Sequence, residues 1–255
     1  MGKLRVLDLF SGIGGFSLGL ERTGGFETVA FCEIEDYPRK VLAKHWPDVP
    51  IYEDVRDVEP MAVDVITGGF PCQDISIAGY VVGKRDGLDG QRSGLWSEFW
   101  RLIRDIRPRY AIVENVTDLL NGPLGSGKWF GRIMSELASI GYDAEWHYIS
   151  ASAVGAPQNR GRVWIVAYPS GKRVERLVTS KDISVSGSWG WRGKEDLRDV
   201  RAFERSDRWP KPIVRGVDDG IPRRVDRLKG LGNAVVPQIP EMIGYAILEA
   251  EKFND

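Results

Sequence analysis

Short apolar runs alternate with amphipathic segments through the first two thirds of the chain. Runs rich in aliphatic and β-branched residues predict strands at 4–10, 28–32, 63–67, 110–113, 145–149 and 162–168. Apolar side chains three and four residues apart predict helices at 36–45, 95–106 and 129–140, and we expect two more, one of about eight residues from Phe16 and one over 238–252. This alternation predicts an α/β fold with a mostly parallel sheet, which binds ligands outside the carboxyl ends of its strands.

Two stretches interrupt the alternation. Residues 79–94 space glycines among charged side chains, which is typical of a surface loop, and we expect a lid over a site there. Residues 169–222 lack clear periodicity and mix tryptophans with many arginines. We therefore predict a main domain over 1–168, a small lobe over 169–222 and a C-terminal segment over 223–255 that returns to the main domain.

The composition is that of an ordinary globular protein. Of 255 residues, 42% are hydrophobic and 28% are charged, which excludes the disordered, collagen-like and fibrous classes. Neither a membrane-spanning run nor a signal-peptide pattern is present in the sequence, so we expect a cytoplasmic protein without membrane association. Cys32 and Cys72 make neither a disulfide framework nor a four-ligand zinc site, and with only two histidines besides we expect no metal.

The formal net charge of −1 conceals an uneven distribution. Residues 151–230 contain 18 basic and 10 acidic side chains, whereas the rest of the chain contains 17 and 26. A basic segment in an otherwise acidic chain is typical of a surface that binds nucleic-acid phosphates, because each neutralised phosphate releases condensed counterions. The alternative is a solvated charged surface.

A glycine-rich turn follows the first predicted strand. Gly12-Ile13-Gly14-Gly15 lies where a nucleotide-like cofactor approaches the backbone, although Ser17 replaces the third glycine of the dinucleotide fingerprint. By itself such a turn is also compatible with a tight connection. Glu33 follows the second strand, where it can accept hydrogen bonds from ribose hydroxyls. Asp54 follows a further likely strand that precedes the run 63–67, and there it can bind an adenine amino group. Together these features indicate a nucleoside cofactor.

Four further residues of reactive or charged type follow or precede predicted strands. Cys72 comes after the strand 63–67, and its thiolate is a good nucleophile for soft carbon, although most isolated cysteines are small buried hydrophobes. Glu114 comes after the strand 110–113, where it acts either as a proton donor with a raised pKa or as a cap or loop hydrogen-bond acceptor. Arg160 and Arg162, two residues apart in an extended segment, point the same way and can clamp an anion.

Five motifs in order resemble those of the DNA (cytosine-5)-methyltransferase family. They are Asp8-Leu9-Phe10-Ser11-Gly12-Ile13-Gly14-Gly15-Phe16, Gly69-Phe70-Pro71-Cys72-Gln73, Glu114-Asn115-Val116, Gln158-x-Arg160-x-Arg162 and Gly232-Asn233-Ala234-Val235. They come in the family's order and are spread over nearly the whole chain, and the ordered set is far more specific than any one motif. The resemblance implies a Rossmann-like S-adenosylmethionine-dependent methyltransferase fold with a small target-recognition lobe.

The resemblance also implies which residues hold S-adenosylmethionine. Phe10, Ser11, Gly12 and Gly14 would line its amino-acid and ribose side, with Glu33 at the ribose hydroxyls and Ile34 on the adenine face. Asp54 and Val55 would hold the adenine edge. The pocket would be completed by Pro71, Leu95, Asn233 and Ala234.

The implied reaction takes place on a cytosine flipped out of double-stranded DNA. Cys72 would add to carbon 6 while Glu114 hydrogen-bonds to ring nitrogen 3, so that carbon 5 can take the methyl group. Arg162 would support the adduct from the carbonyl side, with Arg160 beside it at the target nucleotide. Gln73, Ser76 and Arg92 would contact the DNA around the flipped nucleotide.

The chain departs from the family's larger members in one interval. Only 69 residues, Val163 to Leu231, separate the arginine motif from the last motif, which favours a short recognition site or a partner that supplies specificity. We expect a monomer. The alternatives are the same chemistry on transfer RNA, a silent DNA-binding module, which would lack Cys72 or Glu114, and a nicotinamide-dependent oxidoreductase, which would leave Pro71-Cys72-Gln73 unexplained.

Overall fold

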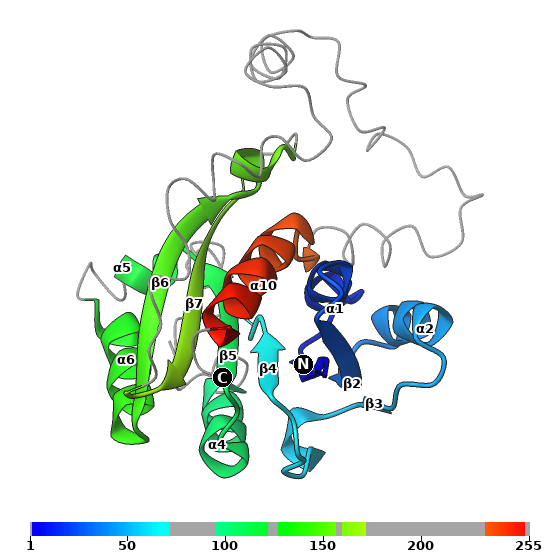
Figure 1. The fold of residues 1–255 in the computed structure, drawn as a ribbon, viewed down its shortest axis with the longest axis horizontal. Coiled ribbons are helices and arrows are strands. Elements are labelled where there is room, and N and C mark those ends of the chain that lie inside the picture. Colours follow the sequence, from blue (N-terminus) through cyan, green and yellow to red (C-terminus); the bar gives the residue numbers. More distant parts are fainter. Residues whose placement is uncertain (1, 72–94, 122–126, 157–159, 172–232, 253–255) are drawn as a thin grey trace, which may run out of the picture.

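A twisted sheet forms the centre of the molecule (Figure 1). The computed structural model describes residues 2–71, 95–121, 127–156, 160–171 and 233–252. Within these ranges the sheet has seven strands in the order β3-β2-β1-β4-β5-β7-β6. The strands are β1 (Leu4–Leu9), β2 (Phe26–Cys32), β3 (Ile51–Tyr52), β4 (Val65–Gly68), β5 (Tyr110–Val116), β6 (Tyr142–Ser150) and β7 (Gly161–Pro169).

Helices lie between most of these strands, in the alternation that the sequence predicts, and one more follows the last strand. They are α1 (Gly15–Arg22), α2 (Asp36–His45), α4 (Trp96–Ile106), α5 (Asp118–Asn121), α6 (Lys128–Ser139) and α10 (Gln238–Glu251), with short 3-10 turns η1 (Val55–Asp57) and η5 (Ala151–Val154). α4 illustrates why they form, because Trp96, Phe99, Leu102 and Ile103 recur on one face and are all buried. None of the helices in the described ranges has both the length and the apolar character needed to cross a membrane.

The predicted α/β class and mostly parallel sheet are confirmed. β1, β2, β3, β4 and β5 pair in parallel, whereas β7 is antiparallel to both β5 and β6. One detail of the prediction was wrong, since Glu114 and Asn115 lie within β5 and do not follow it. The apolar run ends at Val113, but pairing with β7 carries the ladder on to Val116.

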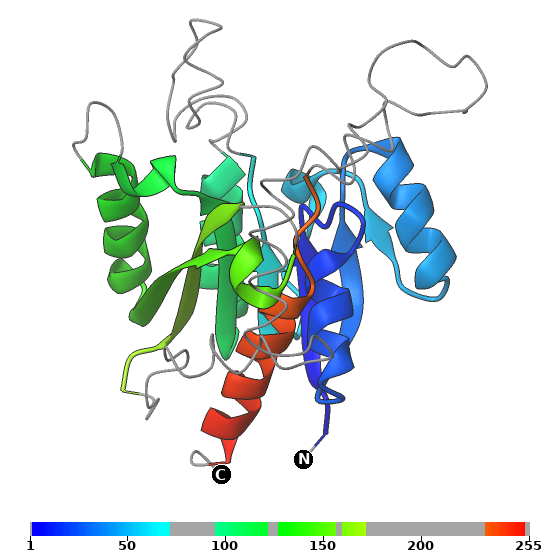
Figure 2. The same cartoon turned by 90° about the horizontal axis from the view of Figure 1, so that it is seen from above.

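The two faces of the sheet carry separate cores, because successive strand residues point to opposite sides. On one face, β-strand side chains such as Val6 and Ile112 pack with residues of α1 and α10. Figures 1 and 2 show these two helices side by side. On the other face, residues such as Leu7 and Val113 pack with α4, α5 and α6. The parallel strands therefore end at an edge bordered by helices on both sides.

The predicted small lobe, 169–222, lies almost entirely outside the described residues, and the loop 79–94 lies outside them altogether. The division into 1–168, 169–222 and 223–255 therefore stays a prediction. The described part of the last segment is α10 and the residues that lead into it, and α10 packs against α1.

Candidate functional site

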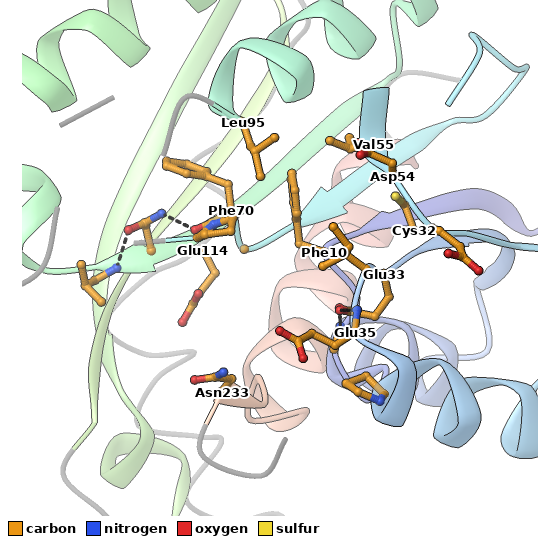
Figure 3. A pocket seen from close by; sticks show the side chains of 18 of the residues that line it. Phe10, Cys32, Glu33, Glu35, Asp54, Val55, Phe70, Leu95, Glu114 and Asn233 are labelled. Atoms are coloured by element: carbon orange, nitrogen blue, oxygen red, sulfur yellow. Dashed lines mark hydrogen bonds between the residues drawn. The ribbon is translucent and has the colours of Figure 1, made fainter. Parts of the chain in front are cut away.

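A pocket of about 300 Å³ opens at the carboxyl edge of the parallel strands (Figure 3). Residues from the ends of β1, β2, β4 and β5, from the start of β7 and from the segment before α10 line it. This is the edge at which open α/β sheets bind their ligands. Figure 3 shows Phe10 in the middle of this group, with Glu33 and Glu35 to one side and Glu114 and Asn233 to the other.

The turn after β1 places Phe10 in the pocket in a conformation that bulky side chains rarely adopt. Its φ angle is 51°, in the left-handed region, which costs an L-residue roughly 1–2 kcal/mol. The ring stacks on Phe99 at 6.5 Å between centroids. The next residue, Ser11, bonds through its backbone N–H to the Cys32 carbonyl at 3.0 Å, which ties the turn to the end of β2. These contacts maintain the unusual backbone.

Glu33 joins the glycine turn to the segment after β2. One carboxylate oxygen accepts a hydrogen bond from the Gly12 N–H at 2.7 Å and the other from the Glu35 N–H at 2.8 Å. Burial raises the pKa of the Glu33 carboxyl, and these two backbone donors lower it in part. Each oxygen keeps a second lone pair for a donor in the pocket.

Asp54 lines the pocket, and its carboxylate forms an ion pair with Arg56. Its carboxylate accepts the Arg56 backbone N–H at 3.0 Å and binds the Arg56 guanidinium through both oxygens, at 2.9 and 2.5 Å. The side-chain bond to Arg56 is the main reason that the pKa of Asp54 lies below its usual range. Its neighbour Val55 is buried and also lines the pocket.

Glu114 and Arg162 form an ion pair that the strand register creates. In the β5–β7 ladder Glu114 lies opposite Trp164, and Arg162, two residues earlier in β7, shares its face. Arg162 Nε is 2.9 Å from Glu114 Oε1. Burial raises the pKa of the Glu114 carboxyl, whereas the charges of Arg162 and Arg160 lower it. The group is therefore a shielded carboxyl with a cation beside it.

Asn115 points to the opposite face from Glu114 and holds the neighbouring turn. Its side-chain amide donates to the Phe70 carbonyl at 3.1 Å, and its side-chain oxygen accepts the Val116 N–H at 2.9 Å. The bond fixes the turn that carries Pro71, which lines the pocket. Cys72 follows Pro71 in the chain and lies outside the described residues.

The structure brings twelve of the predicted site residues to one pocket: Phe10, Gly12, Glu33, Ile34, Asp54, Val55, Pro71, Leu95, Glu114, Arg160, Arg162 and Asn233. Three others do not line it. The Ser11 hydroxyl turns inward to the Asp8 and Cys32 carbonyls, Gly14 faces the Trp46 ring, and Ala234 offers its carbonyl to Arg160. Gln73, Ser76 and Arg92 lie, with Cys72, outside the described residues.

Sequence reasoning missed ten residues that also line the pocket: Cys32, Glu35, Tyr37, Pro38, Glu53, Arg56, Gly69, Phe70, Asn115 and Val116. Most are direct neighbours of predicted residues at the same sheet edge, and this adjacency was the available signal. Among the described residues, no group of three or more His, Cys, Asp or Glu side chains is arranged to hold a metal ion.

Comparison with known proteins identifies relatives over most of the chain. The type II methyltransferase M2.BsuMI of Bacillus subtilis (strain 168) is 38% identical over 169 residues, which cover 64% of this chain and 42% of that protein. M.Sau3AI of Staphylococcus aureus is 37% identical over 185 residues, covering 66% and 44%. The orphan methyltransferase M.SPRI of Bacillus phage SPR is 34% identical over 173 residues, covering 65% and 38%. The chain thus spans less than half the length of these relatives.

Solved structures share the fold. A protein encoded within an E. coli prophage and assigned as a DNA modification methyltransferase is 26% identical, with a TM-score of 0.57, over 70% of this chain and 50% of that one. The DNMT2 of Spodoptera frugiperda, at 20% identity and a TM-score of 0.56, covers 70% of this chain and 54% of its own and shows likeness of fold alone. The family model for C-5 cytosine-specific DNA methylase matches residues 4–200, more than half of the chain. The chain therefore belongs to the C-5 cytosine-specific DNA methylase family.

Proposed function

We propose that this protein transfers a methyl group from S-adenosylmethionine to carbon 5 of a cytosine flipped out of double-stranded DNA. The observation that carries the proposal is the shared pocket. The Glu114–Arg162 ion pair lies in the same pocket as the glycine turn, whose Gly12 N–H donates to Glu33. Pro71, which precedes Cys72 in the chain, lines this pocket too. A cofactor side and a reaction side therefore adjoin.

The cofactor side suits an adenosyl group with a positive charge. The apolar side chains of Phe10, Val55 and Leu95 offer flat and aliphatic surface, and Glu33 offers carboxylate oxygens for ribose hydroxyls. Four acidic side chains lie there as well, Glu33, Glu35, Glu53 and Asp54. Asp54 is paired with Arg56 and Glu53 with Arg39, so Glu33 is the one that most favours a cation. When bound, S-adenosylmethionine supplies an electrophilic methyl group on a sulfonium.

On the reaction side, the chain must make carbon 5 of cytosine electron-rich. The Cys72 thiolate adds to carbon 6, and a protonated Glu114 hydrogen-bonds to ring nitrogen 3 as negative charge develops there. The raised pKa of Glu114 favours its protonated form. Arg162 orients that carboxyl and faces the carbonyl side of the base. After carbon 5 is methylated, its proton leaves and Cys72 is expelled, which restores the aromatic ring.

The chemistry requires the base to leave the duplex, because its atoms are shielded by stacking. The excess of basic residues in 151–230 supports contact with DNA phosphates around an extruded cytosine. The lobe 169–222 is the segment that we propose reads the target sequence.

Methyl incorporation tests the proposal directly. Purified protein and tritiated S-adenosylmethionine are incubated in two parallel reactions, one with duplex DNA and one with unmodified transfer RNA. We expect label in DNA alone, and bisulfite sequencing of that DNA should place it on cytosine in one sequence context. Label in transfer RNA alone would move the activity to RNA, and label in neither would refute the proposal.

A further inference from the structure

The two arginines at the start of β7 bind different partners although they are two residues apart. Arg162 pairs with the Glu114 carboxylate at 2.9 Å. Arg160 donates from one terminal nitrogen to the Ala234 carbonyl at 2.6 Å and from the other to the Asn233 carbonyl at 3.3 Å. A guanidinium keeps its charge at any physiological pH, so these donors are permanent.

The carbonyls that Arg160 holds belong to the segment that leads into α10. On its other side this segment lies against α1, so closely that a β-carbon on Gly15 would be 2.5 Å from the Val235 carbonyl oxygen. Residues 233–235 therefore lie between α1 and the Arg160 side chain and contact both. Asn233, at the start of the segment, lines the pocket.

The far end of α10 has its own anchor. Glu251 is fully buried, accepts a hydrogen bond from the Tyr110 hydroxyl at 2.9 Å and pairs with Arg109. Loss of the Arg160 contacts would therefore release the leading segment while the helix stays attached to the sheet. Arg160 therefore acts mainly on the wall of the pocket, and its charge also lowers the pKa of Glu114.

We infer that Arg160 is a positioning residue: it holds the backbone of residues 233–234 so that Asn233 closes the pocket around the cofactor from the Glu114 side, while Arg162 serves the target base. The inference rests on the proposed function, and it reassigns Arg160, which the motif resemblance puts at the target nucleotide. Arg160 acts through the backbone of residues 233–234. Removal of its side chain should therefore raise the Kd for S-adenosylmethionine.

Binding and turnover measurements on Arg160→Ala test the inference. We expect the Kd for S-adenosylmethionine to rise at least about tenfold, since two charge-assisted bonds are lost, while kcat at saturating cofactor stays within about threefold. Arg160→Lys should recover part of the affinity, because one ammonium can still reach a carbonyl. Arg22→Ala is the matched control, since Arg22 contacts Glu241 of α10 away from the pocket and its loss should leave Kd unchanged.

Hydrogen exchange on ligand-free protein gives an independent readout. In the wild type the Ile239 N–H bonds to the Val236 carbonyl at 3.1 Å, and exchange in a peptide covering 233–241 should quicken in Arg160→Ala. Unchanged Kd and unchanged exchange, with a kcat lowered as in Arg162→Ala, would overturn the inference. If the wild type binds no S-adenosylmethionine, the proposed function fails instead, and the exchange comparison still decides whether Arg160 holds the segment.

Discussion

Gly69 lies directly against the carboxylate of Glu114: a β-carbon on Gly69 would be 2.9 Å from Glu114 Oε2. Gly69 belongs to the turn after β4, and Glu114 lies near the end of the adjacent strand β5. The missing side chain leaves the space that the carboxylate occupies beside Arg162. At Gly68, by contrast, a β-carbon would be 2.6 Å from the Leu9 carbonyl oxygen, which belongs to the backbone of β1.

Substitution of these two glycines should separate activity from stability. In Gly69→Ala the new methyl group displaces the flexible end of Glu114, so we expect turnover to fall at least about tenfold with little change in Tm. In Gly68→Ala the methyl group meets rigid backbone, and the cost should appear as a lower Tm. Methylation rates and thermal unfolding of both variants provide the check. Full activity of Gly69→Ala would mean that the position of the Glu114 carboxylate does not limit the reaction.

The pH dependence of turnover should show the ionisation of Glu114. Burial raises the pKa of this carboxyl, and the protonated form is the one that can donate to the base. As pH rises through that pKa the donor is lost, so the rate should fall on the alkaline side. Glu114→Gln has no proton to lose and should be slower overall but lack this fall. A falling limb that persists unchanged in Glu114→Gln would assign it to another group.

Asp8 should make the protein more stable at mildly acidic pH. It is fully buried, it accepts hydrogen bonds from the Ser17 and Thr67 hydroxyls at 2.7 and 2.9 Å, and burial raises its pKa to about 7. An unfolded aspartate has a pKa of about 3.9. Below that value both states are protonated and this contribution is fully present. It is lost as pH rises from about 4 to 7, by on the order of 4 kcal/mol for a shift of this size.

Urea unfolding at pH 5.5 and pH 8 measures this effect. The wild type should lose free energy of unfolding between the two values, and Asp8→Asn, which cannot ionise, should lose less. Identical pH dependence in the two proteins would show that Asp8 does not titrate in this range.

Cys72→Ser should abolish methyl transfer while leaving S-adenosylmethionine binding largely intact, because a serine hydroxyl is a far weaker nucleophile for carbon 6. DNA containing 5-fluorocytosine provides a sharper test, since the fluorine prevents release of the covalent adduct. Wild-type protein should become joined to it in the presence of S-adenosylmethionine, and the variant should not. Methylation by Cys72→Ser would contradict the assignment of the nucleophile.

DNA affinity should depend steeply on salt. If the basic segment 151–230 contacts phosphates, log K falls against log salt with a slope of about −0.9 for each phosphate neutralised. The slope is measured by binding titrations between about 50 and about 200 mM salt, because protein–DNA complexes weaken strongly over this range. Arg223→Gln or Arg224→Gln should reduce it by about one, if that arginine contacts a phosphate. A flat dependence would place the DNA contact outside this segment.

Much of the architecture could be predicted because it is encoded locally. The mostly apolar run at 4–10, bounded by a glycine turn, predicts a buried strand, and the spacing of Phe99, Leu102 and Ile103 predicts a helix with one buried face. The end of β5 could not be predicted in this way, because Glu114 and Asn115 are polar and join the strand only through their ladder with β7.

The sequence by itself determined the alternation of most strands and helices along the chain, the glycine turn followed by Glu33, and the ordered motifs that indicate the family. Only the tertiary structure decided which partner each functional side chain has. Arg160 and Arg162 look equivalent in the chain, yet one bonds to the Ala234 carbonyl, 74 residues away, and the other to Glu114 on a neighbouring strand. Local pattern reflects burial and backbone preference, whereas such pairings depend on strand register and on how closely distant segments pack.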